Sequence, residues 1–214
     1  MMAPSTEKLV EDLESDIIFG RLLPHQELLE DALMARFSAK RHIVRAAIQE
    51  LVARRIVVKP RSKSARVKGF SAAEVSEIYD MRALLQGQAA RIMPFPVSPD
   101  GLKNLKEIHV RYAAAASVGA DQSLIHRLND EFHNQLFALC QHKVLCKAIT
   151  FYTEASNPIR SYGISDKAWL EQAITEHTAM IQAIEGQDRA ALESLVVEHM
   201  QPSRRRWESR QPGH

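Results

Sequence analysis

The sequence predicts a mostly α-helical protein in which an N-terminal winged helix-turn-helix precedes an all-α antiparallel helical bundle. Three observations lead to this fold class. Two short amphipathic patterns follow one another with only Ser38 and Ala39 between them, as in a helix-turn-helix. After Arg55 a β-branched run changes the period from that of a helix to that of a strand. Beyond Ser71 no stretch is rich in strand signals, so we expect a bundle of about six helices there.

Length and composition limit the class of protein. A chain of 214 residues with 45% hydrophobic residues can form one large domain or two small ones. It begins without a cationic, apolar leader, and no apolar run approaches the ~18 residues that span a bilayer, so we expect a cytoplasmic protein without a membrane partner. The spacing of Cys140 and Cys146 matches neither a redox pair nor a zinc site, which predicts free thiols.

The charge is distributed unevenly along the chain. Residues 1–70 hold 13 Lys or Arg and 9 Asp or Glu, a net charge of +4, whereas residues 71–214 hold 15 and 17, a net charge of −2. Between Arg36 and Lys68 there are 11 basic residues and one acid, Glu50. Such a concentration favours binding to the phosphates of a nucleic acid.

The N-terminal region is expected to hold three helices. The first runs from Glu7 to Phe19 and ends at Gly20. The second has Leu29, Leu33 and Phe37 at four-residue spacing on one face. In the third, an apolar stripe of Ile43, Ala47 and Leu51, flanked by Val44 and Ile48, predicts the face that packs against the core.

The other side of the third helix carries the polar stripe of Arg41, Arg45 and Gln49. In a helix-turn-helix the second helix of the pair enters a DNA groove by its N-terminal residues. An ordinary helical hairpin with a solvated basic face shows the same pattern, and this stretch alone does not choose between the two.

A small β-hairpin, or wing, is expected directly after the helix pair. Its strands are the extended runs IVVKP and ARVKGF, and the basic turn RSKS joins them. Basic side chains on or near it, among them Lys63, can lie against a sugar-phosphate backbone. The other basic residues of this group are Arg61, Arg66 and Lys68.

The capping box from Ser71 to Glu74 marks a helix start, so we place the domain boundary there, with domains at residues 1–70 and 71–214. The first bundle helix ends before MPFPVSP, and Ser98 and Pro99 open the next. Further helices are expected over 121–140, 143–153 and 166–185, and from Asp188 to near Pro202, with a break at NPIRSYG and a frayed polar tail after 202.

Histidines on three of these helices point toward the core. His177 lies seven, four and three residues after the apolar Leu170, Ala173 and Ile174. His199 has the same spacing to Leu192, Leu195 and Val196, and His133 shares a helix face with Asn129, with His126 close to that face. A single inward histidine is usually a hydrogen-bonded core residue. Three of them beside an amide oxygen favour a metal site, with zinc, nickel, manganese or iron as the ion.

Taken together, these segments resemble the GntR family of transcription regulators, in the FadR-like branch whose C-terminal effector domain is called FCD. The resemblance covers nearly the whole chain. Its N-terminal part is GRLLPHQELLEDALMARFSAKRHIVRAAIQELVARRIV. Its C-terminal parts are IYDMRALLQGQAAR, NDEFHNQLF and EHTAMIQAIEGQDRAALESLVVEHM.

The resemblance implies roles for particular residues. Arg41 and Arg45 would contact DNA, with Lys40 and His42 at the leading end of the recognition helix, while Gln49 and Lys63 extend the DNA-binding surface that the polar stripe and the wing predict. The metal ligands would be the same set that helix geometry selects, Asn129, His133, His177 and His199. Arg82 stands where the family often has an arginine beside its effector pocket, which implies a small organic acid as effector.

The chain also departs from the family pattern. Lys40 replaces the usual Ser or Thr, and Arg55 and Ser64 replace glycines before and within the wing, so the wing's path is expected to differ. Asn129 stands where the family often has Asp, and a neutral amide oxygen is a weaker ligand for a hard cation than a carboxylate. Asp130, the obvious substitute, points about 100° away on an ideal helix. A metal-free site whose histidines bind the effector directly is the alternative.

From the sequence we therefore expect a homodimeric transcription regulator, most simply a repressor, and not an enzyme. Its N-terminal domain would bind double-stranded operator DNA, and its C-terminal domain would bind a divalent ion, with zinc, nickel or manganese favoured, together with a small carboxylate. Two DNA-binding domains, one from each subunit, are expected because a single one offers too few base contacts for operator affinity. The alternative function is a metal-dependent enzyme with a basic N-terminal localisation module, since a mononuclear three-histidine site can activate water.

Overall fold

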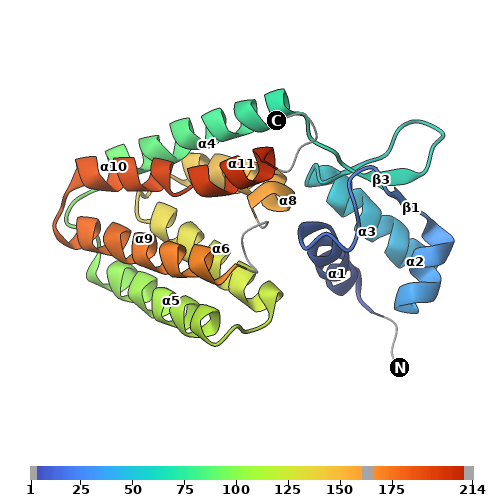
Figure 1. Ribbon diagram of the computed structural model, residues 1–214, viewed down its shortest axis with the longest axis horizontal. Helices are drawn as coiled ribbons and strands as arrows, with labels where there is room; N and C mark the ends of the chain where they lie inside the picture. Colours follow the sequence, from blue (N-terminus) through green and yellow to red (C-terminus); the bar gives the residue numbers. More distant parts are fainter. Residues whose placement is uncertain (1–3, 161–165, 210–214) are drawn as a thin grey trace. The chain divides into compact units, whose positions relative to one another are not determined.

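The computed structural model describes residues 4–160 and 166–209, and the chain forms two compact units that divide between Ser71 and Ala72 (Figure 1). Each unit has its own hydrophobic core. No helix among the described residues is both long enough and apolar enough to cross a membrane.

The first unit contains the helix-turn-helix that the sequence predicts. Its helices are α1 (Thr6–Ile18), α2 (Glu30–Phe37) and α3 (Arg41–Ala53). Ser38 makes the corner after α2 with a left-handed backbone, φ 50°, and the amide of Ala39 bonds the carbonyl of Met34. The left-handed turn ends α2 and redirects the chain within two residues, as expected for a helix C-terminus.

A three-stranded antiparallel sheet completes this unit. Its strands are β1 (Glu27–Leu28), β2 (Val57–Val58) and β3 (Ala65–Val67), in the order β1-β3-β2. Strands β2 and β3 form the predicted wing hairpin, with Val57 opposite Val67. Strand β1, which places Leu28 opposite Ala65, was not expected, because two residues are too few to show a strand period.

The core of the first unit lies between α1, α3 and the sheet. Leu13 of α1 and Leu51 of α3 are fully buried, and α1 packs along α3. Four residues of the predicted apolar stripe of α3 are buried, at Val44, Ala47, Ile48 and Leu51, whereas Ile43 is only partly buried against the same core. The expectation for Leu29 was wrong: this residue precedes α2 as its N-cap and stays 51% exposed.

Six long helices close into a ring in the second unit (Figure 1). Neighbours around the ring pack in the order α4, α10, α9, α5, α6 and α7, and α7 returns to α4. Two short helices complete the described part of the unit. The bounds are α4 (Ala72–Ile92), α5 (Pro99–Ser117), α6 (Gln122–Ala138), α7 (Lys143–Ala155), α8 (Asn157–Arg160), α9 (Lys167–Glu185), α10 (Arg189–Glu198) and α11 (Gln201–Glu208).

The two short helices correct the sequence expectation. The break expected at NPIRSYG begins instead as α8, and the rest of that motif, residues 161–163, lies outside the described residues. The tail expected to be frayed is helical as α11, with Ser203 and Trp207 buried. Trp207 gives α11 one large apolar contact, which the polar composition of the tail conceals. The last part of the tail, residues 210–214, lies outside the described residues.

Candidate metal centre and DNA-binding surface

All six side chains predicted to contact DNA are exposed in the first unit. Lys40 is the N-cap of α3, and Arg41 and His42 form its first turn. Arg45 and Gln49 continue the same polar side one and two turns later, away from the buried stripe. Lys63 lies in the turn between β2 and β3, where its amide bonds the carbonyl of Pro60. The described structure therefore leaves every one of them accessible to a nucleic acid.

Acids at the start of α2 hold the two arginines of α3. Oε2 of Glu30 lies 2.8 Å from Nε of Arg45 and 3.4 Å from Nη1 of Arg41. Asp31 adds a contact of 2.6 Å to Nη2 of Arg41. Both terminal nitrogens of Arg41 are thus engaged by carboxylates, whereas Glu30 takes only Nε of Arg45. The Arg45 side chain is 60% exposed and can donate onward from its terminal nitrogens.

The three predicted histidines meet inside the bundle. His133 comes from α6, His177 from α9, and His199 is the residue after α10. Their nearest ring nitrogens all lie within 4.8 Å of one another, and Nε2 of His133 is 3.2 Å from Nε2 of His199. Three imidazoles at this separation can hold one metal ion in the fold described.

His177 is the most deeply buried histidine of the cluster. It is fully buried, and neither of its ring nitrogens has a hydrogen-bond partner among the described residues. Its ring stacks on Phe132 with centroids 4.0 Å apart. Burial lowers the pKa of His177 and of His133 well below the usual range, so both are neutral near pH 7, the form that binds metal.

Glu176 is hydrogen-bonded to one histidine of the cluster, His199. Its Oε2 lies 2.5 Å from Nδ1 of His199 and accepts that nitrogen's hydrogen bond, which leaves Nε2 of His199 directed at His133. Burial alone would raise the pKa of Glu176, but the hydrogen bond from His199 lowers it. A carboxylate behind a ligating histidine fixes its tautomer and makes it more basic. Sequence reasoning missed Glu176, and its position next to His177 gives no signal of a contact with a residue 23 positions away.

Asn129 lies in the same interior, and Asp130 does not replace it. The side chain of Asn129 is buried and its Oδ1 has no hydrogen-bond partner among the described residues. Asp130 instead contacts Arg160 of α8, and its Oδ2 lies 3.5 Å from Nε2 of His126. Burial alone would raise the pKa of Asp130, but the Arg160 guanidinium lowers it. Asp130 is therefore engaged by Arg160, whereas Oδ1 of Asn129 remains without a partner among the described residues.

A small cavity of about 30 Å³ adjoins the cluster. Its lining includes His133, His199 and Asn129, together with Arg82 of α4 and Arg160. Arg82 is 6% exposed, and its Nε and Nη1 have no partner among the described residues. Burial lowers the pKa of Arg82 from its usual value, but an arginine stays protonated in proteins. The cavity therefore holds a guanidinium with unused donors beside the histidines.

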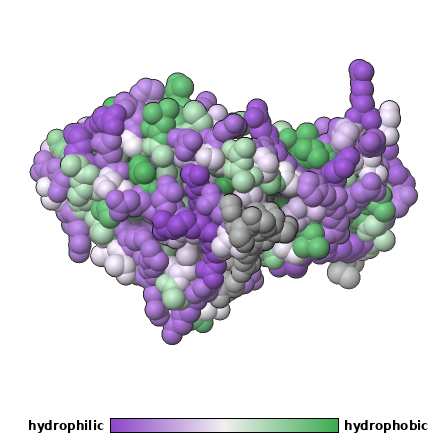
Figure 2. Space-filling view, turned by 45° about the horizontal axis from the view of Figure 1, so that its top comes forward, coloured by the Kyte–Doolittle hydropathy of each residue, from purple (hydrophilic) through white to green (hydrophobic). Residues whose placement is uncertain are grey.

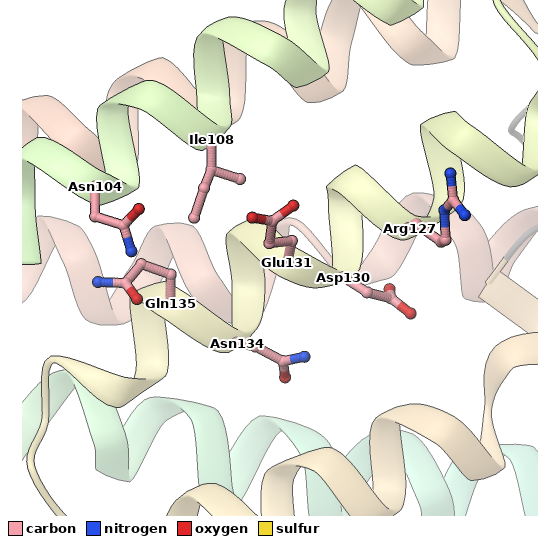
Figure 3. Close-up of a pocket in the computed structure, with 7 residues that line it drawn as sticks. All are labelled: Asn104, Ile108, Arg127, Asp130, Glu131, Asn134 and Gln135. Atoms are coloured by element: carbon pink, nitrogen blue, oxygen red, sulfur yellow. The ribbon is translucent and has the colours of Figure 1, made fainter.

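A larger groove of about 540 Å³ lies on the outside of the bundle, between α5 and α6 (Figure 3). Its lining is mostly polar and includes Asn104, Glu131 and Asn134. None of the three clustered histidines lines it. Figure 3 shows Asn134 and Asp130 extending from α6 on the side away from α5. We assign no site to this open groove.

Comparisons with known proteins agree with this two-part organisation. The family model described as bacterial regulatory proteins, gntR family, matches residues 5–67, and the model of the FCD domain matches residues 77–202. The second match alone covers more than half of the chain. No curated protein sequence matches the chain significantly.

Solved structures share the fold at low sequence identity. McbR/YncC of E. coli has a TM-score of 0.78 at 20% identity, over 97% of this chain and 99% of that one. A GntR-type protein of Rhodococcus sp. RHA1 has a TM-score of 0.75 at 17% identity, over 96% and 98%. Lar of Listeria monocytogenes, which controls the agr system of that organism, has a TM-score of 0.66 at 14% identity, over 99% and 100%.

Proposed function

Since this chain belongs to the GntR family of bacterial regulatory proteins and carries a C-terminal FCD domain, we propose that a small carboxylic acid and a divalent metal ion control its binding to DNA. Family membership makes the chain a DNA-binding transcription regulator and not an enzyme. The alternative of a metal-dependent enzyme with a basic localisation module is therefore set aside.

For the DNA contact we propose the exposed side of α3 together with the wing. Arg41 and Arg45 would enter the major groove, with Lys40, His42 and Gln49 beside them and Lys63 on the backbone. The terminal nitrogens of Arg45, which have no acceptor among the described residues, support a bidentate contact to a guanine. The operator would be an inverted repeat bound by a homodimer, because one head offers few base contacts.

For the metal we propose Asn129, His133, His177 and His199 as ligands of a zinc, nickel or manganese ion. The observation that carries this proposal is the fully buried His177, whose two nitrogens have no partner among the described residues. One of these nitrogens lies within 4.8 Å of a ring nitrogen of His133 and of His199. A buried imidazole without a partner costs free energy unless a ligand satisfies it. When bound, such an ion supplies positive charge and open coordination positions suited to a carboxylate.

For the effector we propose an acid whose carboxylate pairs with Arg82. A buried guanidinium with two unused nitrogens is unfavourable alone and favourable once it binds an anion. Arg160 in the same cavity already has Asp130 and Asn157 as partners, so Arg82 is the cation with donors to spare. The cavity of about 30 Å³ restricts the acid to a small one unless the walls move.

The DNA proposal is tested by operator binding. Sites selected from random duplex DNA provide the probe, and fluorescence anisotropy gives the affinity of the chain and of the Arg45→Ala variant. We expect that variant to lose about 1–3 kcal/mol of operator binding, while Arg111→Ala, which removes an exposed arginine of α5, changes little. Equal binding by all three proteins would refute the assignment of Arg45.

The metal proposal is tested by native mass spectrometry with elemental analysis of the chain after dialysis against zinc, nickel or manganese. We expect one ion for each chain, and none in His177→Phe, whose ring can still stack on Phe132. The control His25→Ala removes an exposed histidine of the first unit and should keep the ion. An ion retained by His177→Phe would show that the cluster is not the site.

A further inference from the structure

The two cysteines of the chain are in contact where α6 leads into α7. Both are free thiols, as the sequence predicts, and their Sγ atoms lie 3.8 Å apart. Cys140 comes two residues after the end of α6, and Cys146 lies in the first turn of α7. Five residues separate them along the chain, in place of the two of a redox CxxC motif, so their spacing did not reveal the pair.

A tight turn between the two helices brings the thiols together. The backbone of Gln141 is left-handed, φ 58°, and its amide donates to the carbonyl of Ala138. Such a residue ends one helix and redirects the chain within a few positions. His142 then caps the next helix, since its Nδ1 accepts a hydrogen bond from the amide of Leu145. The contact between the thiols follows from the geometry of this turn.

The two sulfurs differ in their exposure. Cys140 belongs to the core of the bundle and is 5% exposed, whereas Cys146 is half-buried. The Cys146 thiol donates a hydrogen bond to the carbonyl of Phe137, over 3.3 Å. Burial, with the Cys140 thiol beside it, raises the pKa of Cys146 to about 11, so this thiol is protonated near pH 7. A protonated thiol reacts slowly, so we expect the pair to stay reduced until an oxidant accumulates.

The connection next to the pair is open to solvent. Its exposed residues are Gln141, His142, Lys143 and Val144. Val144 is 74% exposed, and Figure 2 shows how hydrophobic residues of this kind reach the surface as separate green patches among purple, hydrophilic ones. A small polar oxidant can therefore approach Cys146 from the connection, while the core shields Cys140.

We propose that Cys140 and Cys146 form a modification site, at which a peroxide converts the two thiols into a reversible disulfide within the chain. The thiolate of Cys146 attacks one oxygen of hydrogen peroxide, the O–O bond breaks, and the released hydroxide is protonated to water. The Cys140 sulfur then attacks the resulting sulfenic acid. The S–S bond forms, the S–O bond breaks, and a second water leaves with the Cys140 proton. One peroxide is thus reduced to two waters while two thiols become one disulfide.

The change demanded of the fold is small. The sulfurs must approach from 3.8 Å to about 2.05 Å, and the Cys146 thiol must leave the Phe137 carbonyl. That carbonyl keeps the amide of Cys140 as a donor, so oxidation does not leave it unpaired. Neither the metal ion nor the acid of the proposed function takes part in the reaction, so each proposal can fail without the other.

Trypsin and mass spectrometry test the disulfide directly. Lys143 lies between the two cysteines, so cleavage after it leaves peptides 128–143 and 144–147 joined only by the disulfide. We expect hydrogen peroxide to lower the mass of the folded chain by about 2 Da and to produce this joined pair of peptides, and we expect dithiothreitol to restore two thiols. Thiols that survive a large excess of peroxide, sulfinic acids on the separate cysteines, or a disulfide between two chains would overturn the proposal.

Two controls separate the effect of the fold from that of the sequence. In Cys140→Ser and Cys146→Ser the remaining thiol has no second cysteine in its chain, so neither variant should lose about 2 Da. Thermal unfolding confirms that each variant is folded. In urea, where the turn is lost, the equilibrium with glutathione should favour the disulfide roughly tenfold less than in the folded chain. Equal equilibria would overturn the claim that the contact between α6 and α7 creates the site.

Discussion

Oε2 of Glu176 lies 2.5 Å from Nδ1 of His199, and the next residue along α9 is His177, so one turn of helix supplies both a candidate ligand and the support of another. We expect Glu176→Gln to reduce metal affinity about 10- to 100-fold, because the amide cannot supply the negative charge that makes His199 more basic. Competition with a chelating dye measures the affinity. Glu171→Gln, an exposed change on the same helix, should have no effect, and equal losses in both variants would contradict the role of Glu176.

A substitution at Asn129 is expected to increase metal affinity, in contrast to the loss expected for Glu176→Gln. Asn129→Asp replaces a buried amide oxygen without a partner by a carboxylate, so we expect tighter binding of manganese or zinc by roughly tenfold or more. Without metal the same variant should be less stable than the unaltered chain, since it buries a charge. Asn134→Asp, on the exposed side of α6, is the control for both effects. Unchanged metal affinity in Asn129→Asp would exclude residue 129 as a ligand.

In the proposed DNA complex, the carboxylate of Glu30 would compete with DNA for Arg41 and Arg45 of α3. We expect Glu30→Gln to raise non-specific DNA affinity about three- to tenfold at low salt, since it removes a negative charge beside the phosphates. It should also lower the ratio of operator to non-specific binding, because Nε of Arg45 loses the acceptor that orients it. Anisotropy titrations at several salt concentrations measure both quantities. Glu107→Gln makes the same charge change in α5 of the second unit and should alter neither quantity.

His126 makes stability depend on pH. Burial lowers its pKa from 6.5 to about 4, so the unfolded chain binds a proton at this residue as the pH falls below 6.5 while the folded chain does not. Its contribution to stability is complete above pH 6.5 and is lost between pH 6.5 and 4, with about 2 kcal/mol gone by pH 5. Urea unfolding at pH 7 and pH 5 measures the loss. In His126→Gln the loss should be smaller by that amount; an identical loss would contradict it.

Four helix starts in the second unit were well predicted, whereas the helix expected to reach Pro202 ends at Glu198. Ser98, Asp121, Asp166 and Asp188 each stand at a predicted helix start, and each accepts a hydrogen bond from the first turn of its helix. Capping is a local interaction, so neighbouring residues reveal it. Strand β1 and the short helices α8 and α11 were missed, because their stability comes from distant contacts. The register of Leu28 with Ala65 and the burial of Trp207 are two such contacts.

The candidate site, too, was predicted in part and missed in part. Periodicity directed His133, His177 and His199 inward from three helices, and the fold brings their nitrogens within 4.8 Å of one another. Periodicity describes one helix at a time, so it carried no information on contacts between helices. The pairing of Asp130 with Arg160 and that of Glu176 with His199 are contacts of this second kind. The Asp130–Arg160 pair determines that Asp130 is engaged away from the histidines. The Glu176–His199 pair determines that Nε2 of His199, and not Nδ1, faces His133.

The neutral Asn129 also bears on cooperativity between the ion and the acid. Where the family often has Asp, an anionic ligand already offsets part of the ion's charge. In the proposed ligand set, three imidazoles and an amide would bring no formal negative charge directly to the ion, whose site adjoins the cavity that Arg82 lines. The acid would supply the missing negative charge, so each ligand should bind far more tightly in the presence of the other, by the same factor in either direction. The metal affinity measured without the acid would then be lower than the metal affinity in the presence of the acid.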